Sequence, residues 1–130
     1  MAATLRYVRV YADPTGESHI AFHELSLSTK SFAPPAPPLD VSAHLAASAF
    51  ALLRLPAAWW GEWHPSPYRQ WLFFMTGTAI ISVSDGEHCE VRSGSIVLLK
   101  DIAGKAHQTR VTGGNEVIIG SVTPRDVDDA

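Results

Sequence analysis

The chain has 130 residues, which is the size of one domain and too short for two independent hydrophobic cores. Hydrophobic residues make up 46% of the sequence and charged residues 18%, a composition typical of globular rather than disordered proteins. The formal net charge is -3 and the 10 basic residues form no cluster, so we expect no nucleic-acid partner. The lone cysteine, Cys89, excludes an internal disulfide and a zinc site built from thiolates.

The hydropathy pattern predicts neither a secretory leader nor a membrane span. Arg6 and Arg9 interrupt the N-terminal region where a signal peptide needs an apolar run. The longest nearly apolar stretch, residues 45–53, is too short to cross a bilayer. We therefore expect a cytoplasmic protein with no membrane partner.

The N-terminal part of the chain predicts two strands followed by a proline-rich arm. Residues 6–11 and 18–27 are rich in β-forming side chains, and the sequence Asp-Pro-Thr-Gly between them predicts a turn. Residues 31–39 hold four prolines and predict an extended polyproline-type arm. The arm is either a PxxP ligand for a partner domain or a segment packed on its own fold or on a dimer mate, and we favour the packed arm.

Residues 43–55 carry conflicting signals. Their alanines favour a helix by intrinsic propensity. A strand that ends before Pro56 accommodates Phe50 and Leu52 more easily. We predict a strand over residues 48–55.

The second half of the chain predicts six more strands separated by glycine-containing turns. Asp85-Gly86 between two β-rich runs is typical of a type I′ hairpin. The predicted strands are residues 71–75, 78–84, 87–91, 95–99, 107–111 and 116–122.

Closely spaced short strands with no predicted helix indicate an all-β sandwich or barrel. We treat residues 1–130 as a single domain. Within it, residues 6–45 supply the N-terminal strands and the arm, residues 46–123 form the barrel, and residues 124–130 are an acidic, frayed tail.

The chain has six histidines, and two of them stand in segments that suggest a site. His19 and His23 share one face of a predicted strand but lie about 13 Å apart, too far to bind one metal ion. His88 and Cys89 are neighbours on a strand and point to opposite faces, so they do not form a nucleophilic pair. The two that suggest a site are His64, which precedes the most apolar strand, and His107, which follows a glycine-containing loop.

The segment around His64 resembles the first motif of the cupin superfamily, in which His-x-His is followed by a glutamate and then a glycine. Placing Gly77 on that glycine puts His64 and Ser66 on the two histidine positions. Gln70 then falls on the position of the glutamate.

The segment around His107 resembles the second cupin motif. Gly94, Gly104 and His107 match its glycine–loop–glycine–histidine frame, with a longer loop and no proline. The loop over residues 101–107 and the proline arm are also similar to those of a group of small cupin-domain proteins. The resemblance covers nearly the whole chain, with the motifs inside residues 61–111.

The resemblance implies a cupin-type double-stranded β-helix, that is, a jelly-roll barrel. It also implies a homodimer, which the proline arm and the aromatic surplus favour. Trp59, Trp60 and Trp63 either line the mouth of the barrel or anchor a subunit interface, where aromatic residues are enriched.

A cupin metal site normally offers three histidines and a glutamate, and Ser66 and Gln70 replace two of these ligands here. The resemblance therefore implies a weaker site at His64, Gln70 and His107, holding a divalent transition metal (iron, manganese, nickel or zinc) or no metal. Because side chains alternate along a strand, polar and apolar groups should also converge on a small-molecule pocket. The expected lining residues are Ser66, Tyr68, Leu72, Phe74 and Thr109.

Two functions follow from this site, and both stay open at this point. The first is a metal-dependent enzyme of the dioxygenase, isomerase or decarboxylase type that acts on a small organic molecule. The second is a non-catalytic small-molecule or sugar-binding protein without a functional metal. The retained histidines favour the enzyme, the two missing ligands favour the binding protein, and no catalytic residue is assigned.

Overall fold

The computed structural model describes residues 3–125, and every regular element in that range is a β-strand. The strands alternate between buried and exposed side chains where they cover the core, as expected for sheets with one buried face. Their bounds are β1 Ala3–Ala12, β2 Ser18–Lys30, β3 Leu39–Val41, β4 Ala47–Leu55, β5 Gln70–Thr76, β6 Thr78–Val83, β7 His88–Arg92, β8 Ile96–Leu99, β9 His107–Thr112 and β10 Val117–Pro124.

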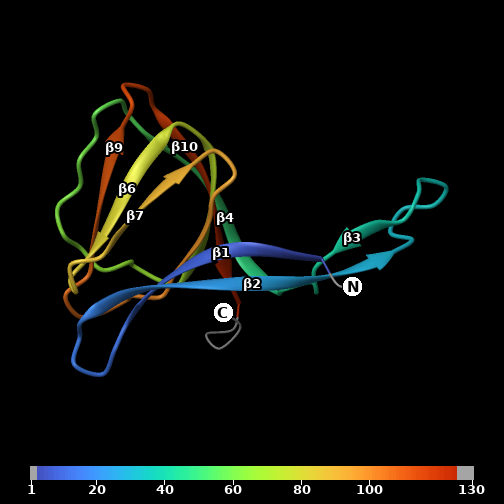
Figure 1. Ribbon diagram of the computed structural model, residues 1–130, viewed down its shortest axis with the longest axis horizontal. Helices are drawn as coiled ribbons and strands as arrows, with labels where there is room; N and C mark the ends of the chain where they lie inside the picture. Colours follow the sequence, from blue (N-terminus) through green and yellow to red (C-terminus); the bar gives the residue numbers. More distant parts are fainter. Residues whose placement is uncertain (1–2, 126–130) are drawn as a thin grey trace.

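The strands form two sheets that enclose one core (Figure 1). The larger sheet has the order β3-β2-β1-β8-β5-β10-β4, and the smaller sheet has the order β7-β6-β9. All pairings are antiparallel except the short parallel contact between β1 and β8. Both sheets contribute to the buried cluster between them, whose fully buried members include Val10, Ile81, Val83, Val91, Val97 and Val117.

The predicted strands are present, including the ambiguous one, which is β4. Beyond the strands, one predicted turn type is wrong. The β6–β7 hairpin does turn at Asp85-Gly86, but of these two residues only Gly86 has a positive φ, at 95°. A type I′ turn requires a positive φ at both central residues. The turn is therefore a longer one that uses a single left-handed glycine.

The proline segment also differs from the prediction. Residues 31–40 are exposed throughout, and a turn at Ala33–Ala36 closes them, with the Ala36 N–H donating to the Ala33 carbonyl (2.9 Å). The prolines thus supply turn geometry at the tip of the β2–β3 hairpin instead of an extended run. In Figure 1 the far end of this hairpin projects beyond the other strands, so the proline segment does not pack on the body of its own chain.

The C-terminal end is ordered further than expected, because β10 continues to Pro124. The rest of the predicted acidic tail, residues 126–130, lies outside the described residues. Nothing in residues 3–125 forms a helix of the length and apolar character that crossing a membrane requires.

Candidate functional site

The two candidate histidines are brought together by backbone pairing. The irregular segment 59–64 runs along the edge of β9, and His64 pairs there with His107 as an isolated antiparallel bridge. The N–H of each residue donates to the carbonyl of the other, at 3.0 and 3.2 Å. Directly opposed residues in an antiparallel pair point to the same side. The two imidazole rings accordingly lie together, with their centroids 4.9 Å apart and their planes at 53°.

Each imidazole has one nitrogen engaged by the protein. The Nδ1 of His107 lies 2.5 Å from Oδ2 of Asp101, and the Nδ1 of His64 lies 2.6 Å from the carbonyl oxygen of Glu62. Carboxylate and carbonyl oxygens accept hydrogen bonds, so Nδ1 is the donor in both rings. In the neutral form of each ring, Nε2 then has a lone pair that can accept a hydrogen bond or bind a ligand.

Asp101 is fully buried, and the loop that carries it is tied down on both sides. Its main-chain carbonyl accepts from the Ser66 N–H (3.0 Å). Farther along the loop, the Lys105 N–H donates to the Gly16 carbonyl in the β1–β2 turn (2.8 Å). The second carboxylate oxygen, Oδ1, has no hydrogen-bond partner among the described residues. The buried carboxylate of Asp101 therefore serves to position the His107 ring.

Gln70 is held in a network of its own. Its Nε2 donates to Ser66 Oγ (2.9 Å), and that hydroxyl donates to the Tyr68 carbonyl (2.7 Å). Its Oε1 accepts from Ser121 Oγ (2.6 Å). Both ends of the amide already have partners, so binding of a metal ion by Oε1 would compete with the Ser121 hydroxyl.

A cavity of about 160 Å³ lies between the sheets beneath the two histidines. Apolar side chains from both sheets form most of its wall, and the polar side chains in it are His64, Gln70, His107 and Thr109. It is lined by Leu53, Leu55, Trp59, His64, Gln70, Leu72, Phe74, Ile81, Leu99, His107, Thr109 and Ile119.

The structure places most of the predicted site residues in this cavity, but not all of them. It is lined by the three predicted metal ligands, His64, Gln70 and His107, and by Leu72, Phe74 and Thr109. Ser66 is buried beneath Gln70 and does not line it, whereas Tyr68 is half exposed and borders a separate surface depression. The prolines on either side of Ser66 prevent a regular strand there, so the alternation assumed for this segment does not hold.

Sequence reasoning missed two parts of the site. The apolar wall contributed by β4, β6 and β10 follows from strand alternation, but the sequence does not show which strands face the histidines. Nothing in the sequence marks Asp101 as a site residue, because a polar residue at the start of a loop is normally solvated. Only the closed loop brings Asp101 to His107. Trp59 is the one tryptophan of the three that reaches the cavity.

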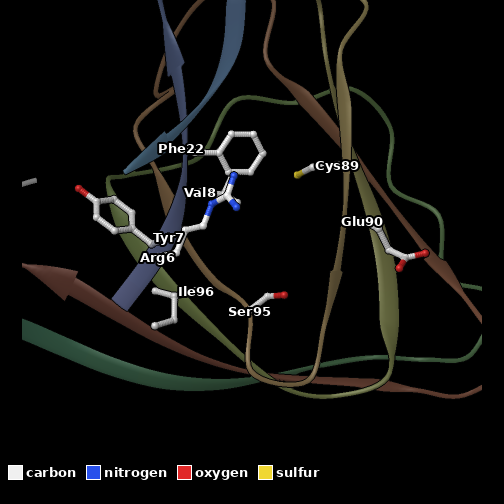
Figure 2. A pocket seen from close by; sticks show the side chains of 8 residues that line it. All are labelled: Arg6, Tyr7, Val8, Phe22, Cys89, Glu90, Ser95 and Ile96. Carbon is white, nitrogen blue, oxygen red and sulfur yellow. The ribbon is translucent and has the colours of Figure 1, made fainter. Parts of the chain in front are cut away.

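A wider depression of about 470 Å³ lies at the open side between β1 and β7. Figure 2 shows Phe22 and Cys89 facing each other across its opening. Its charged groups already have partners, since the Arg6 guanidinium lies 4.3 Å from the Phe22 ring centroid and Glu90 pairs with Arg92. Burial raises the pKa of the Cys89 thiol, which disfavours a reactive thiolate. We therefore assign the functional site to the histidine cavity.

The architecture is similar to that of two solved structures. The cupin domain of Cnp3 from Schizosaccharomyces pombe matches with a TM-score of 0.52 over 96% of this chain and 84% of that chain, at 9% identity. Protein NMB1881 from Neisseria meningitidis matches with a TM-score of 0.42 over 58% of this chain and 71% of that chain, at 20% identity. No protein-family description and no curated protein matches the sequence. The two-sheet arrangement and the match to the Cnp3 cupin domain make the fold a cupin-like jelly roll, as the resemblance to the two motifs implied.

Proposed function

We propose that this cupin-fold chain binds a compact small molecule in the cavity beneath His64 and His107. One observation carries the proposal: both rings commit Nδ1 to protein acceptors, and both line the same apolar cavity. Two imidazoles that line one mostly apolar cavity, each able to accept through Nε2 in its neutral form, can anchor a polar group of a ligand. A mostly apolar pocket with a few convergent polar groups is the usual form of such a site.

The volume and the donor pattern restrict the ligand. An apolar cavity of about 150 Å³ is large enough for benzene, and this cavity measures about 160 Å³. The ligand that fits best is therefore the size of a single ring. It carries a hydroxyl or acid group that donates to the imidazole nitrogens, and its remaining surface is apolar.

The residues present do not fit a resident metal ion. Catalytic zinc sites use three protein ligands, and residues 3–125 contain no group of three or more His, Cys, Asp or Glu side chains placed to hold an ion. The third predicted ligand, Gln70 Oε1, already accepts from Ser121. We therefore place the binding protein ahead of the metal-dependent enzyme and derive no reaction step through a metal.

Phenol and toluene, which differ by a hydroxyl against a methyl group, test the proposal directly. We expect phenol to bind more tightly than toluene and to shift the ¹⁵N resonance of the Nε2 that accepts its hydroxyl proton. His107→Phe should abolish the preference, while His88→Phe, on the exposed edge strand β7, serves as the matched control. Equal binding of the two probes to the unmodified chain would contradict the proposal.

A metal titration separates the two candidate functions. Zn²⁺, Mn²⁺, Fe²⁺ and Ni²⁺ are added singly, followed by dialysis and elemental analysis. Loss of the ion on dialysis supports the metal-free binding protein. Retention of about one ion per chain, lost in His107→Phe, would instead support the metal-dependent enzyme.

A further inference from the structure

The segment between β4 and β5 runs beside β9 and presents alternate residues to the cavity. The Val111 N–H donates to the Trp59 carbonyl (2.8 Å), and the Gly61 N–H donates to a carbonyl of the same strand (3.1 Å). Because side chains alternate along an extended segment, positions 59 and 61 face one side and Trp60 faces the other. Trp59 accordingly lines the cavity, whereas Trp60 is 59% exposed and does not line it.

A tight turn fixes the backbone of Trp59 at the start of this segment. The Trp59 N–H donates to the Pro56 carbonyl (3.0 Å), and Ala58 between them has a φ of 64°, in the left-handed region. Residues other than glycine adopt that region at a cost, and residues held in this way gather at functional sites. Both backbone polar groups of Trp59 are therefore engaged, and only its side-chain torsions can change the position of the indole.

Gly61 supplies the space that the end of the indole occupies. A Cβ placed on Gly61 would lie 2.6 Å from Cη2 and 3.0 Å from Cζ3 of Trp59. Gly61 has no positive φ, so no backbone strain calls for glycine at this position. Since the backbone of Trp59 is held, a larger residue at position 61 must displace the indole, and with it a wall of the cavity.

Flat rings form a large part of the cavity wall. Trp59 and Phe74 contribute aromatic rings, and two further rings are the imidazoles of His64 and His107. Aromatic rings meet a flat aromatic ligand in offset-stacked or edge-to-face arrangements, which stabilise such pairs beyond the burial of apolar area. A saturated ring of the same size buries a similar area without that contribution. The composition of the wall therefore favours a flat ring.

The polar groups of the cavity are too few for a sugar. A pyranose carries hydroxyls around most of its ring, and each hydroxyl that is buried without a partner costs free energy. The cavity offers two imidazoles and the Thr109 hydroxyl, since both ends of the Gln70 amide are already bonded. These groups suffice for one polar substituent, and the rest of the ligand then lies in apolar surroundings.

We propose that Trp59, held against Gly61, is the residue that makes the cavity selective for a flat aromatic ring. This inference rests on the ligand site proposed above and names the class of its ligand. That class is a monocyclic phenol or aromatic acid, in place of a sugar or a saturated alcohol. Trp59 acts on the ring of the ligand, while the histidines anchor its polar substituent, so the two parts of the site contribute separately to affinity.

Phenol and cyclohexanol test this selectivity, because each carries one hydroxyl on a six-membered ring and only phenol is flat. We expect the unmodified chain to bind phenol more tightly, and Trp59→Leu to reduce the ratio of the two affinities about 2- to 10-fold. Trp59→Phe keeps a flat ring at the wall and should retain most of the ratio. Trp60→Leu, at the neighbouring tryptophan outside the cavity, is the matched control.

Gly61→Ala tests the placement of the indole without removing it. The ratio should fall toward that of Trp59→Leu, because the added Cβ displaces Cη2. Gly120→Ala is the matched control, since Gly120 also lacks a positive φ and a Cβ there would make only an ordinary contact, 3.9 Å from Phe50. A ratio that is the same in both glycine variants would show that Gly61 does not place the ring.

The hydroxyl of phenol is a stronger hydrogen-bond donor than that of cyclohexanol, and this difference acts in every variant alike. The change in the ratio, measured by calorimetric titration, therefore isolates the indole. An unchanged ratio in Trp59→Leu, with phenol still bound, would overturn the inference and leave the proposed site in place. Failure of the unmodified chain to bind either alcohol would contradict the site and the inference together.

Discussion

At the scale of single residues, the site depends on a side chain that never reaches the cavity. Asp101 is fully buried, and its carboxylate accepts from His107 Nδ1 at 2.5 Å. In the neutral ring this contact leaves Nε2 of His107 as an acceptor, and His107 lines the cavity. Carboxylates that hold a histidine in this way set both its tautomer and its ring orientation.

Asp101→Ala should therefore release the tautomer of His107. We expect the ¹⁵N shifts of the imidazole to change from one Nδ1–H tautomer to a mixture, and phenol affinity to fall about 10- to 100-fold. Asp101→Asn should keep the single tautomer and the phenol affinity, because its amide oxygen accepts from Nδ1 in the same place. Asp40→Asn, at an exposed carboxylate bonded to Thr29, is the control. A single unchanged tautomer in Asp101→Ala would show that the contact does not position the ring.

A second feature at the scale of residues is the pair of carboxylates, from Asp13 and Asp85, that flanks His19. The ring nitrogens of His19 lie 2.7 Å from Asp13 and 2.7 Å from Asp85. These hydrogen bonds raise the pKa of His19 above its ordinary value of 6.5. The hydrogen bond from His19, with help from Thr15, holds the pKa of Asp13 well below 3.8.

These shifts predict the pH dependence of folding stability. The contribution of His19 is fully present below pH 6.5 and is lost as the pH rises through its raised pKa. The contribution of Asp13 is present above pH 3.8 and is lost as the pH falls through its lowered pKa. Thermal denaturation should show that His19→Gln removes the loss of stability above pH 6.5. The effect should shrink in high salt, since His19 is 28% exposed. Identical pH profiles for the two proteins would contradict this assignment.

At the scale of elements, the loop between β8 and β9 is held against the β1–β2 turn. Gly104 has a φ of 90°, and a Cβ placed on it would lie 2.5 Å from the Gly16 carbonyl oxygen. This close approach sets the path of the loop from Asp101 to His107. The site geometry is therefore coupled to a turn nearly ninety residues away in the sequence.

Gly104→Ala should destabilise the chain by about 1–3 kcal/mol and weaken phenol binding, because the loop must shift away from Gly16. Gly94→Ala is the matched control, since Gly94 has a φ of 93° but open space where the Cβ would lie. The difference between the two variants in urea denaturation isolates the close contact from backbone strain. Equal losses would indicate that strain alone matters.

Strand β6 offers a comparison between its two faces. Ile81 is 1% exposed and lines the cavity, whereas Ile80 is only half-buried. Ile81→Ala should cost about 2–5 kcal/mol, because it removes buried methyl groups and enlarges the cavity. Ile80→Ala should cost clearly less in the same urea denaturation measurement. Similar costs would mean that the cavity wall adds little to stability.

At the scale of the whole molecule, two sheets bury one core, but the larger sheet is apolar on both faces. The outer face carries the exposed side chains Phe50, Leu52 and Phe73. The histidine cavity lies between the sheets, away from that outer face.

Local patterns in the sequence were sufficient for every strand except the short β3 and for most of the turns, while the resemblance to the two cupin motifs linked the distant His64 and His107. Alternation and the residue before Pro56 identified β4 despite its alanines, and the cupin frame selected His64 and His107 from six histidines. These features depend on neighbours a few residues apart, where backbone sterics and side-chain alternation act directly.

The tertiary structure alone decided which side chains meet. It turned the prolines into a hairpin tip, brought Asp101 to His107, engaged Gln70 with Ser121 and moved Tyr68 out of the cavity. It also left the outer face of the larger sheet uncovered. Each of these outcomes requires contacts between segments far apart in the chain, and such contacts form only when loops close and sheets stack. Propensity and alternation carry no information about that step.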